Sequence, residues 1–135
     1  MKTFLAAGLM ALLVSTAQAQ QLAPEFRKCL DVAVTNYEFS ACSSAEIKRQ
    51  EQLLTAAWAK VSGAMKNAGG NSEGLLLKEQ RAWIVYKDAS CQFYTEQEAF
   101  GREGTVIHFG VCRVKVIASR VKELNDLAED LFKPR

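Results

Sequence analysis

Residues 80–91 read QRAWIVYKDASC and bring aromatic, charged, amide and thiol side chains together in one short stretch. If the stretch is helical, Gln80, Trp83 and Lys87 share one face, because spacings of three and four match the turn of an α-helix. Asp88 could then pair with a neighbouring basic side chain. Two interpretations follow: a buried polar network that fixes the helix register, which we favour, or the rim of a binding site.

The segments on either side of this stretch carry helical rather than strand periodicity. The predicted helix that contains it has an apolar seam at Leu75, Ala82, Tyr86, Ala89 and Phe93, and Leu76 and Trp83 widen this face. The predicted helix before it has its seam at Ile47, Leu54, Trp58, Val61 and Met65. A last helix, starting near Thr105, places on one stripe Val114, Ile117, Val121, Leu124, Ala128 and Leu131. We expect these seams, with most of the aromatic side chains, to form the core.

A further short helix is predicted directly after Pro24, a residue that suits a first helical turn. Residues 35–44 interrupt the helical pattern, and Ser43 or Ser44 is the predicted N-cap of the next helix. Residues 106–111 are rich in β-branched side chains, so a locally extended backbone stays open there. The predicted fold class is all-α: a small antiparallel bundle of about four helices with short connections.

The first nineteen residues have the pattern of a secretory signal peptide. One lysine precedes an apolar run over residues 4–14, and the small-residue ending Ala17-Gln18-Ala19 follows. The apolar run is too short to span a bilayer. We therefore predict a signal peptide over residues 1–19 and a single helical domain over residues 20–135. The mature protein is expected to be periplasmic or secreted, monomeric and not inserted in a membrane.

The charge balance excludes one large class of partners. The chain of 135 residues has 17 Lys and Arg against 15 Asp and Glu, without a long basic tract. A nucleic-acid-binding protein carries a basic patch or stripe that neutralises phosphates, and such a tract is missing from this sequence. We expect no nucleic-acid partner.

Four cysteines follow the predicted cleavage site: Cys29, Cys42, Cys91 and Cys112. An even number in a small exported domain predicts disulfides, with three possible connectivities. A zinc site is disfavoured because no two cysteines form a close C-x₂-C pair. An antiparallel helical hairpin would place Cys91 opposite Cys112 at its closed end, and Cys29 and Cys42 bracket a short turn-like stretch. We therefore predict the pairs 29–42 and 91–112.

Little in the sequence suggests catalysis. His108 is the only imidazole, and it lies between apolar neighbours. A general base needs a nucleophile within reach, and no such pairing is evident. A small hydrolase is the weakest of the hypotheses. We expect no catalytic residue, no metal and no cofactor.

The stretch 80–91 resembles the signature of the LprI-type family, Q-R-x-W-x-x-Y-[RK]-D-x-x-C, named for lysozyme inhibition in exported bacterial proteins. The resemblance extends over most of the mature chain, with matching positions at Cys29, Thr35, Glu38, Cys42, Ile47, Leu54, Trp58, Gly104, Thr105, Cys112, Arg120 and Leu124. Three positions depart from the usual pattern: Glu51, Trp58 and Ile117 stand where Asp, Tyr and Thr are common.

The resemblance implies a disulfide-bonded helical domain that is not an enzyme and that could inhibit a lysozyme by occluding its cleft. It also implies signature residues whose role we expect to be structural: Glu38, Gln80, Trp83, Tyr86, Asp88 and Arg120. The candidate partner-binding loops are residues 97–105, with Arg102 and Thr105, and residues 67–72. The alternative is a structural or interaction module of the periplasm, or of a secretion or effector system, that has no lysozyme target.

Overall fold

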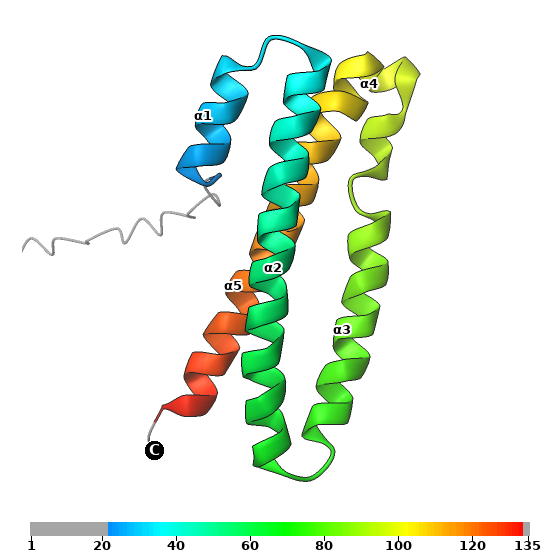
Figure 1. Cartoon of the computed structure of the whole chain (residues 1–135). Coiled ribbons are helices and arrows are strands. Elements are labelled where there is room, and N and C mark those ends of the chain that lie inside the picture. The colour runs from blue at the N-terminus through cyan, green and yellow to red at the C-terminus, as the bar shows by residue number, and fades with distance from the viewer. Residues whose placement is uncertain (1–21, 134–135) are drawn as a thin grey trace, which may run out of the picture.

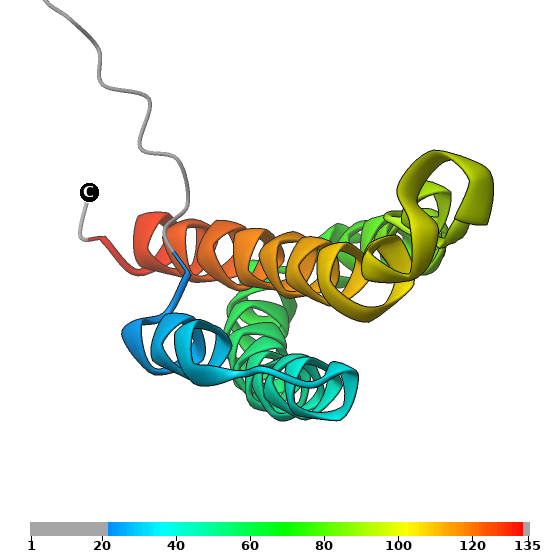
Figure 2. The ribbon, with the colours of Figure 1, turned by 90° about the horizontal axis from the view of Figure 1, so that it is seen from above.

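The two longest helices, α2 (Asn36–Ala68) and α5 (Phe109–Phe132), lie side by side and form the axis of the molecule (Figure 1). The computed structural model describes residues 22–133. Helix α1 (Pro24–Val32) packs against one half of α2, and α3 (Ser72–Ala89) runs back along α2, antiparallel to α5. Viewed from the end, α1 and α2 lie next to each other on one side of α5 (Figure 2). The expected all-helical bundle is confirmed.

The chain between α3 and α5 is also helical. It consists of η1 (Gln92–Thr95), α4 (Gln97–Glu103) and the π-helical turn η2 (Gly104–His108), which leads directly into α5. We call residues 92–103 the cap; they lie near one end of the bundle and project to one side of the long helices in the view of Figure 2. The predicted signal peptide lies outside the described residues.

Helix α5 contributes more buried apolar residues to the core than any other described helix. One cluster contains Ala57, Val61, Leu76, Leu124 and Ala128. A second cluster, nearer the disulfide of α1, contains Phe26, Cys42 and Val114. Ile117 and Val61 are fully buried. Each such aliphatic side chain contributes about 1.5–3 kcal/mol when it leaves water. The seam predicted for α5 is buried at Val114, Ile117, Leu124 and Ala128, whereas its last member, Leu131, is 39% exposed.

Both predicted disulfides are present. Cys29 of α1 is joined to Cys42 of α2 with a Cα–Cα distance of 5.8 Å, and Cys91 is joined to Cys112 with a distance of 5.9 Å. Cys91 lies two residues after the end of α3 and Cys112 lies in the first turn of α5, at the closed end of the predicted hairpin. Disulfides of this kind are typical of proteins outside the cytoplasm. None of the described helices is long and apolar enough to cross a membrane.

The predicted break over residues 35–44 is wrong. Helix α2 starts at Asn36 and continues without interruption, because Thr35 and Glu38 form a capping box at its N-terminus. Ser43 is not an N-cap but a buried residue inside α2. It faces Gly110 of α5, where an added Cβ would lie 2.4 Å from the Ser43 Oγ. Small residues in this stretch serve the close approach of two helices rather than a turn.

The extended backbone left open for residues 106–111 is also not formed. These residues belong to η2 and to the start of α5. Strand propensity mostly measures how a side chain fits a pleated sheet, and the described part of the chain offers no sheet to join. The close contact at Gly110 favours the helix, which packs directly on α2.

The seam predicted for the third helix is wrong in its direction. Leu75 is 61% exposed and Tyr86 is 59% exposed, while Leu76, at the edge of the predicted face, and Gln80 are buried against the bundle. Phe93 is outside α3 altogether, in η1, and is exposed as well. Helix α3 carries apolar side chains around more than one face, so periodicity alone could not choose the buried one.

Candidate binding surfaces

Arg120 of α5 is the centre of the polar network that we predicted at residue 80. Its side chain is only 7% exposed. Its Nε donates to Gln80 Oε1 at 3.0 Å, and its Nη1 donates to Glu79 Oε1 at 2.8 Å and to Glu123 Oε2 at 3.2 Å. The guanidinium also lies 5.8 Å from the ring centre of Trp83. The network joins α3 to α5, which agrees with the structural interpretation of Gln80, Trp83 and Arg120.

Asp88, at the other end of the same stretch, is exposed and more loosely held. Its carboxylate lies 3.4 Å from Lys87 Nζ and 3.5 Å from Arg113 Nη2. Exposed pairs at such distances contribute little to stability. Tyr86 stands on the outside of α3 and lines a shallow groove between α3 and α5 together with Trp83 and Lys115. The sequence stretch thus combines a buried network with an exposed aromatic surface.

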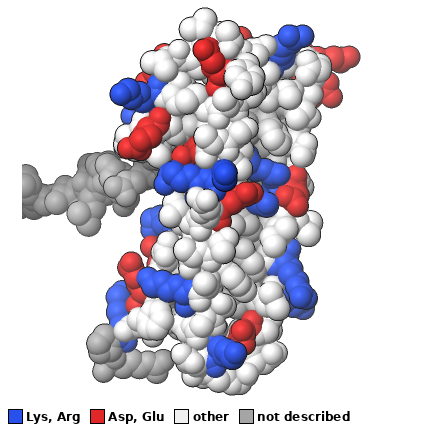
Figure 3. All heavy atoms as spheres, viewed as in Figure 1, with Lys and Arg blue, Asp and Glu red and all other residues white. Residues whose placement is uncertain are grey.

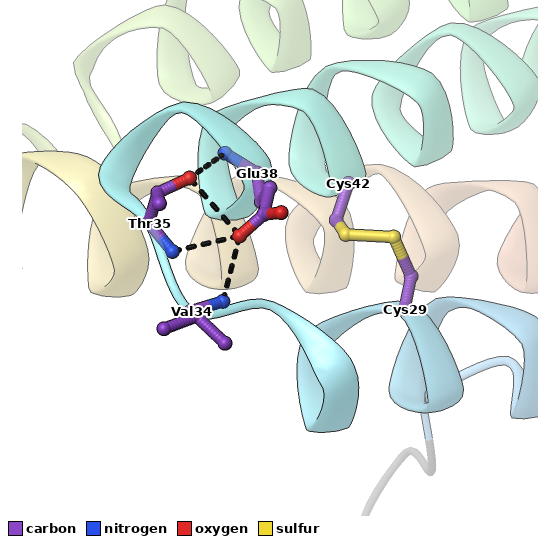
Figure 4. The surroundings of a disulfide bond; sticks show 5 residues. All are labelled: Cys29, Val34, Thr35, Glu38 and Cys42. Carbon is purple, nitrogen blue, oxygen red and sulfur yellow. Dashed lines mark hydrogen bonds between the residues drawn. A yellow bond between two sulfur atoms is a disulfide. The ribbon is translucent and has the colours of Figure 1, made fainter.

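Glu38 has a structural place at the start of α2 (Figure 4). Its carboxylate accepts hydrogen bonds from the backbone amides of Val34 and Thr35, both at 2.8 Å, and Thr35 Oγ1 accepts from the Glu38 amide at 3.2 Å. The hydrogen bonds from the two amides, followed by the one that Thr35 Oγ1 donates to the carboxylate at 3.0 Å, lower the pKa of Glu38 from its ordinary value. The nearby disulfide 29–42 holds α1 against the same end of α2. Together they fix the turn between the two helices.

Two buried polar residues on α2, Glu46 and Gln50, were not singled out from the sequence. Glu46 accepts from Arg49 Nη2 at 2.6 Å and from Gln50 Nε2 at 2.8 Å. The hydrogen bonds from Arg49 lower the pKa of the Glu46 carboxyl. All three residues lie within about one turn of α2, at positions i, i+3 and i+4. In the sequence, such a polar group looks the same as a solvent-exposed helix face, so it did not indicate that Glu46 and Gln50 are buried.

The cap is built on the second disulfide. Cys91, at its base, has a left-handed backbone with φ of 71°, which ends α3 and turns the chain into η1. Gly104, at the other base, packs so tightly that an added Cβ would lie 2.2 Å from the carbonyl oxygen of Tyr94. Gly101, within α4, has φ of 59° and produces the kink at which the chain reverses. The cap is therefore a fixed structure rather than a loose connection.

Aromatic rings form the body of the cap. The ring of Tyr94 lies 4.3 Å from that of Phe93 and 5.1 Å from that of Phe100, and His108 packs 5.5 Å from Tyr94. Phe93 remains 59% exposed and Phe100 38% exposed despite these contacts. The prediction that Phe93 is a core residue was wrong, because the seam that contained it ends where α3 ends.

The two candidate binding residues of this loop lie in different settings. Thr105 is at the base of the cap, where its Oγ1 accepts a hydrogen bond from Gln97 Nε2 at 3.1 Å. Arg102 is exposed and forms no ion pair within residues 22–133. Thr105 thus braces the cap, whereas Arg102 is available on its surface. The other candidate loop, between α2 and α3, contains Gly69 and Gly70 with positive φ and no charged residue.

A further apolar hollow of about 310 Å³ lies where α1 meets α2. Its walls include Val32, Tyr37 and the disulfide 29–42. No cluster of three or more His, Cys, Asp or Glu side chains suited to a metal occurs within the described residues. Charges of both signs are interspersed over the face shown in Figure 3, and acidic side chains project beside a basic one where α4 lies.

Comparison with known proteins identifies this combination of helices and disulfides. A model of the family described as "Lysozyme inhibitor LprI" matches residues 29–124, from the first cysteine to the core leucine of α5. The chain belongs to the LprI lysozyme inhibitor family. The resemblance seen in residues 80–91 is thereby confirmed. Both disulfides, the Arg120 network and the cap lie inside the LprI match.

A relative from Rhizobium meliloti (strain 1021), "Uncharacterized protein R02472", is 28% identical over 134 residues, which cover 92% of this chain and 93% of that protein. No solved structure matches the LprI chain. Membership of the family thus gives the class of protein, and the individual target has to be inferred from the surfaces.

Proposed function

We propose that this protein is an exported, monomeric, non-enzymatic lysozyme inhibitor of the cell envelope. The observation that carries the proposal is the match of a lysozyme inhibitor family over residues 29–124. The two disulfides support a place outside the cytoplasm, where they form and persist. The predicted signal peptide would direct the chain to the periplasm or beyond.

Inhibition would occur by occlusion of the lysozyme cleft. In a lysozyme, two carboxyl groups flank the glycosidic bond that is cleaved, and they lie in a groove that must admit the sugar chain. A rigid protrusion that fills part of this groove excludes the substrate without any chemistry. The cap has the required properties, because it projects to one side near one end of the bundle and is held by the disulfide 91–112. Its exposed Arg102 is the group that we propose to approach the acidic cleft.

Lysis of peptidoglycan in the presence of the purified mature chain tests the proposal. Turbidity of a cell-wall suspension is followed with lysozymes of several types, and we expect inhibition that saturates near one inhibitor per enzyme. A reduced and alkylated sample is the matched control, since it has the same sequence without the two disulfides. The absence of inhibition at a large molar excess with every lysozyme type would refute the inhibitor function.

The second candidate, an interaction module without a lysozyme target, is favoured by one specific observation. The outer face of α3 exposes Leu75, Tyr86 and Val85, the last at 70%. Exposed apolar side chains on one helix face favour a surface that another protein covers. If Tyr86→Ala abolished recovery of an envelope partner while leaving lysozyme inhibition unchanged, this face would serve a function of its own.

A further inference from the structure

The cap concentrates negative charge on a molecule that is otherwise slightly basic. Residues 22–133 contain equal numbers of basic and acidic side chains, 15 of each. Within the cap, Glu96, Glu98 and Glu103 stand against Arg102 alone, so the remainder of the described chain has 14 basic and 12 acidic side chains. The near-neutral total charge thus conceals a separation of charge between the cap and the rest of the molecule.

The cap charges differ from the acidic group at the end of α5 in being unpaired. There, Asp126 pairs with Lys122, and Asp130 pairs with Lys133 at 2.8 Å. In the cap, Glu96 accepts a hydrogen bond from the amide of Glu98 at 3.3 Å, and no cap side chain takes part in an ion pair within the described range. The field of these carboxylates is therefore not cancelled by neighbouring cations.

Exposed aromatic rings accompany this charge. Phe93 and Phe100 have ring centres 6.0 Å apart, and both pack on Tyr94. Because neighbouring rings already hold these side chains in place, the cap loses little conformational entropy when a partner covers them. Buried aromatic side chains at the centre of an interface commonly carry most of its binding energy. Exposed aromatic rings and carboxylates on the same short segment fit a partner whose groove has a basic rim.

We propose that the cap is the surface that binds a lysozyme of net positive charge, with Phe93, Phe100 and Arg102 facing the substrate groove and the glutamates facing its basic rim. This inference rests on the proposed inhibitor function and names the surface that performs it. Opposite charges accelerate the encounter of the two proteins, and the acceleration falls as salt rises. The aromatic contacts then determine how long the complex lasts.

The charge part is tested with two matched double variants of the mature chain. Glu98→Gln/Glu103→Gln removes two charges from the cap, and Glu129→Gln/Asp130→Asn removes two from the far end of α5. Binding to a cationic lysozyme is followed by stopped flow at low and at high NaCl. We expect the cap variant to associate about tenfold more slowly at low salt, with the difference shrinking at high salt. The α5 variant should associate within about twofold of the parent chain.

The aromatic part is tested with Phe100→Ala, for which Tyr86→Ala is the matched control on the outside of α3. We expect Phe100→Ala to raise the dissociation rate about tenfold or more, and Tyr86→Ala to leave it unchanged. Circular dichroism and thermal unfolding of each variant show whether the fold is kept. Phe93→Ala provides a second variant if Phe100→Ala does not fold.

The possible failures can be told apart. If the parent chain inhibits no lysozyme, the proposed function fails and the inference falls with it. If the parent chain inhibits and both cap variants inhibit equally well, the function stands and the cap is not the binding surface. Loss of binding in Tyr86→Ala alone would move the interface to α3 and would also overturn the inference.

Discussion

Helices α5 and α3 have apolar seams of similar spacing, but the seam of α5 is largely buried and the seam predicted for α3 is largely exposed. The seam of α5, at Val114, Ile117 and Leu124, is at most 2% exposed. The seam predicted for α3 is open to solvent at Leu75 and Tyr86. The difference teaches that a periodic stripe marks a surface able to pack, while the arrangement of the neighbouring helices decides whether it does so within the chain.

The largest expected effect comes from truncating the α5 seam. Ile117→Ala removes a fully buried side chain and leaves a cavity, so the free energy of unfolding should fall by about 4 kcal/mol. Leu75→Ala removes a comparable side chain from the α3 seam and should cost less than about 1 kcal/mol. Urea unfolding followed by circular dichroism measures both. Equal losses for the two variants would mean that the α3 seam is packed in solution.

Cutting the link between the two helices should have the next largest effect. Cys91→Ser/Cys112→Ser opens the loop that joins α3 to α5 and should lower the free energy of unfolding by about 3 kcal/mol in the chain-entropy view. In this variant, amide hydrogen exchange should become faster in the cap than it is in the parent chain, and it should change less in α2. If the cap keeps the protection of the parent chain, its rigidity comes from Gly104 and the aromatic rings instead.

The polar contact between the helices is expected to matter less. Arg120→Ala leaves Gln80, which is 8% exposed, without its partner, and the free energy of unfolding should fall by about 2 kcal/mol. Lys122→Ala, which removes an exposed ion pair from the same helix, is the control and should cost about 0.5 kcal/mol or less. Thermal unfolding of the two variants ranks them. If Arg120→Ala lowers the free energy of unfolding by no more than Lys122→Ala does, α3 is held against α5 without this network.

The smallest effect is predicted for the exposed face of α3. Tyr86→Ala should change the free energy of unfolding by no more than about 0.5 kcal/mol, because its ring is 59% exposed. Chemical unfolding checks this value. A loss above about 2 kcal/mol would mean that the ring is buried in solution, for instance against a second copy of the chain, and would contradict the expectation of a monomer.

Several features of the candidate surfaces were predictable because they depend on local order in the sequence. The LprI resemblance in residues 80–91, the disulfide pairs and the buried seams of α2 and α5 all follow from spacing. The network around Gln80 was foreseen as a polar face, although its partner Arg120 lies forty residues away. Phe93 was misplaced because the seam was continued past the end of α3.

The sequence by itself determined the class of this protein: helical periodicity, four cysteines in two pairs and the signature of the LprI family. Tertiary structure alone decided which face of α3 is buried, because that choice depends on Leu76 and Gln80 meeting α2 and α5. It also decided that residues 106–111 are helical, through the close approach of Ser43 and Gly110. The capping box of Thr35 and Glu38, which starts α2 at Asn36, is by contrast a local signal of the sequence. Periodicity indicates which faces of a helix could be buried, whereas contacts between residues far apart in the chain decide which face is buried.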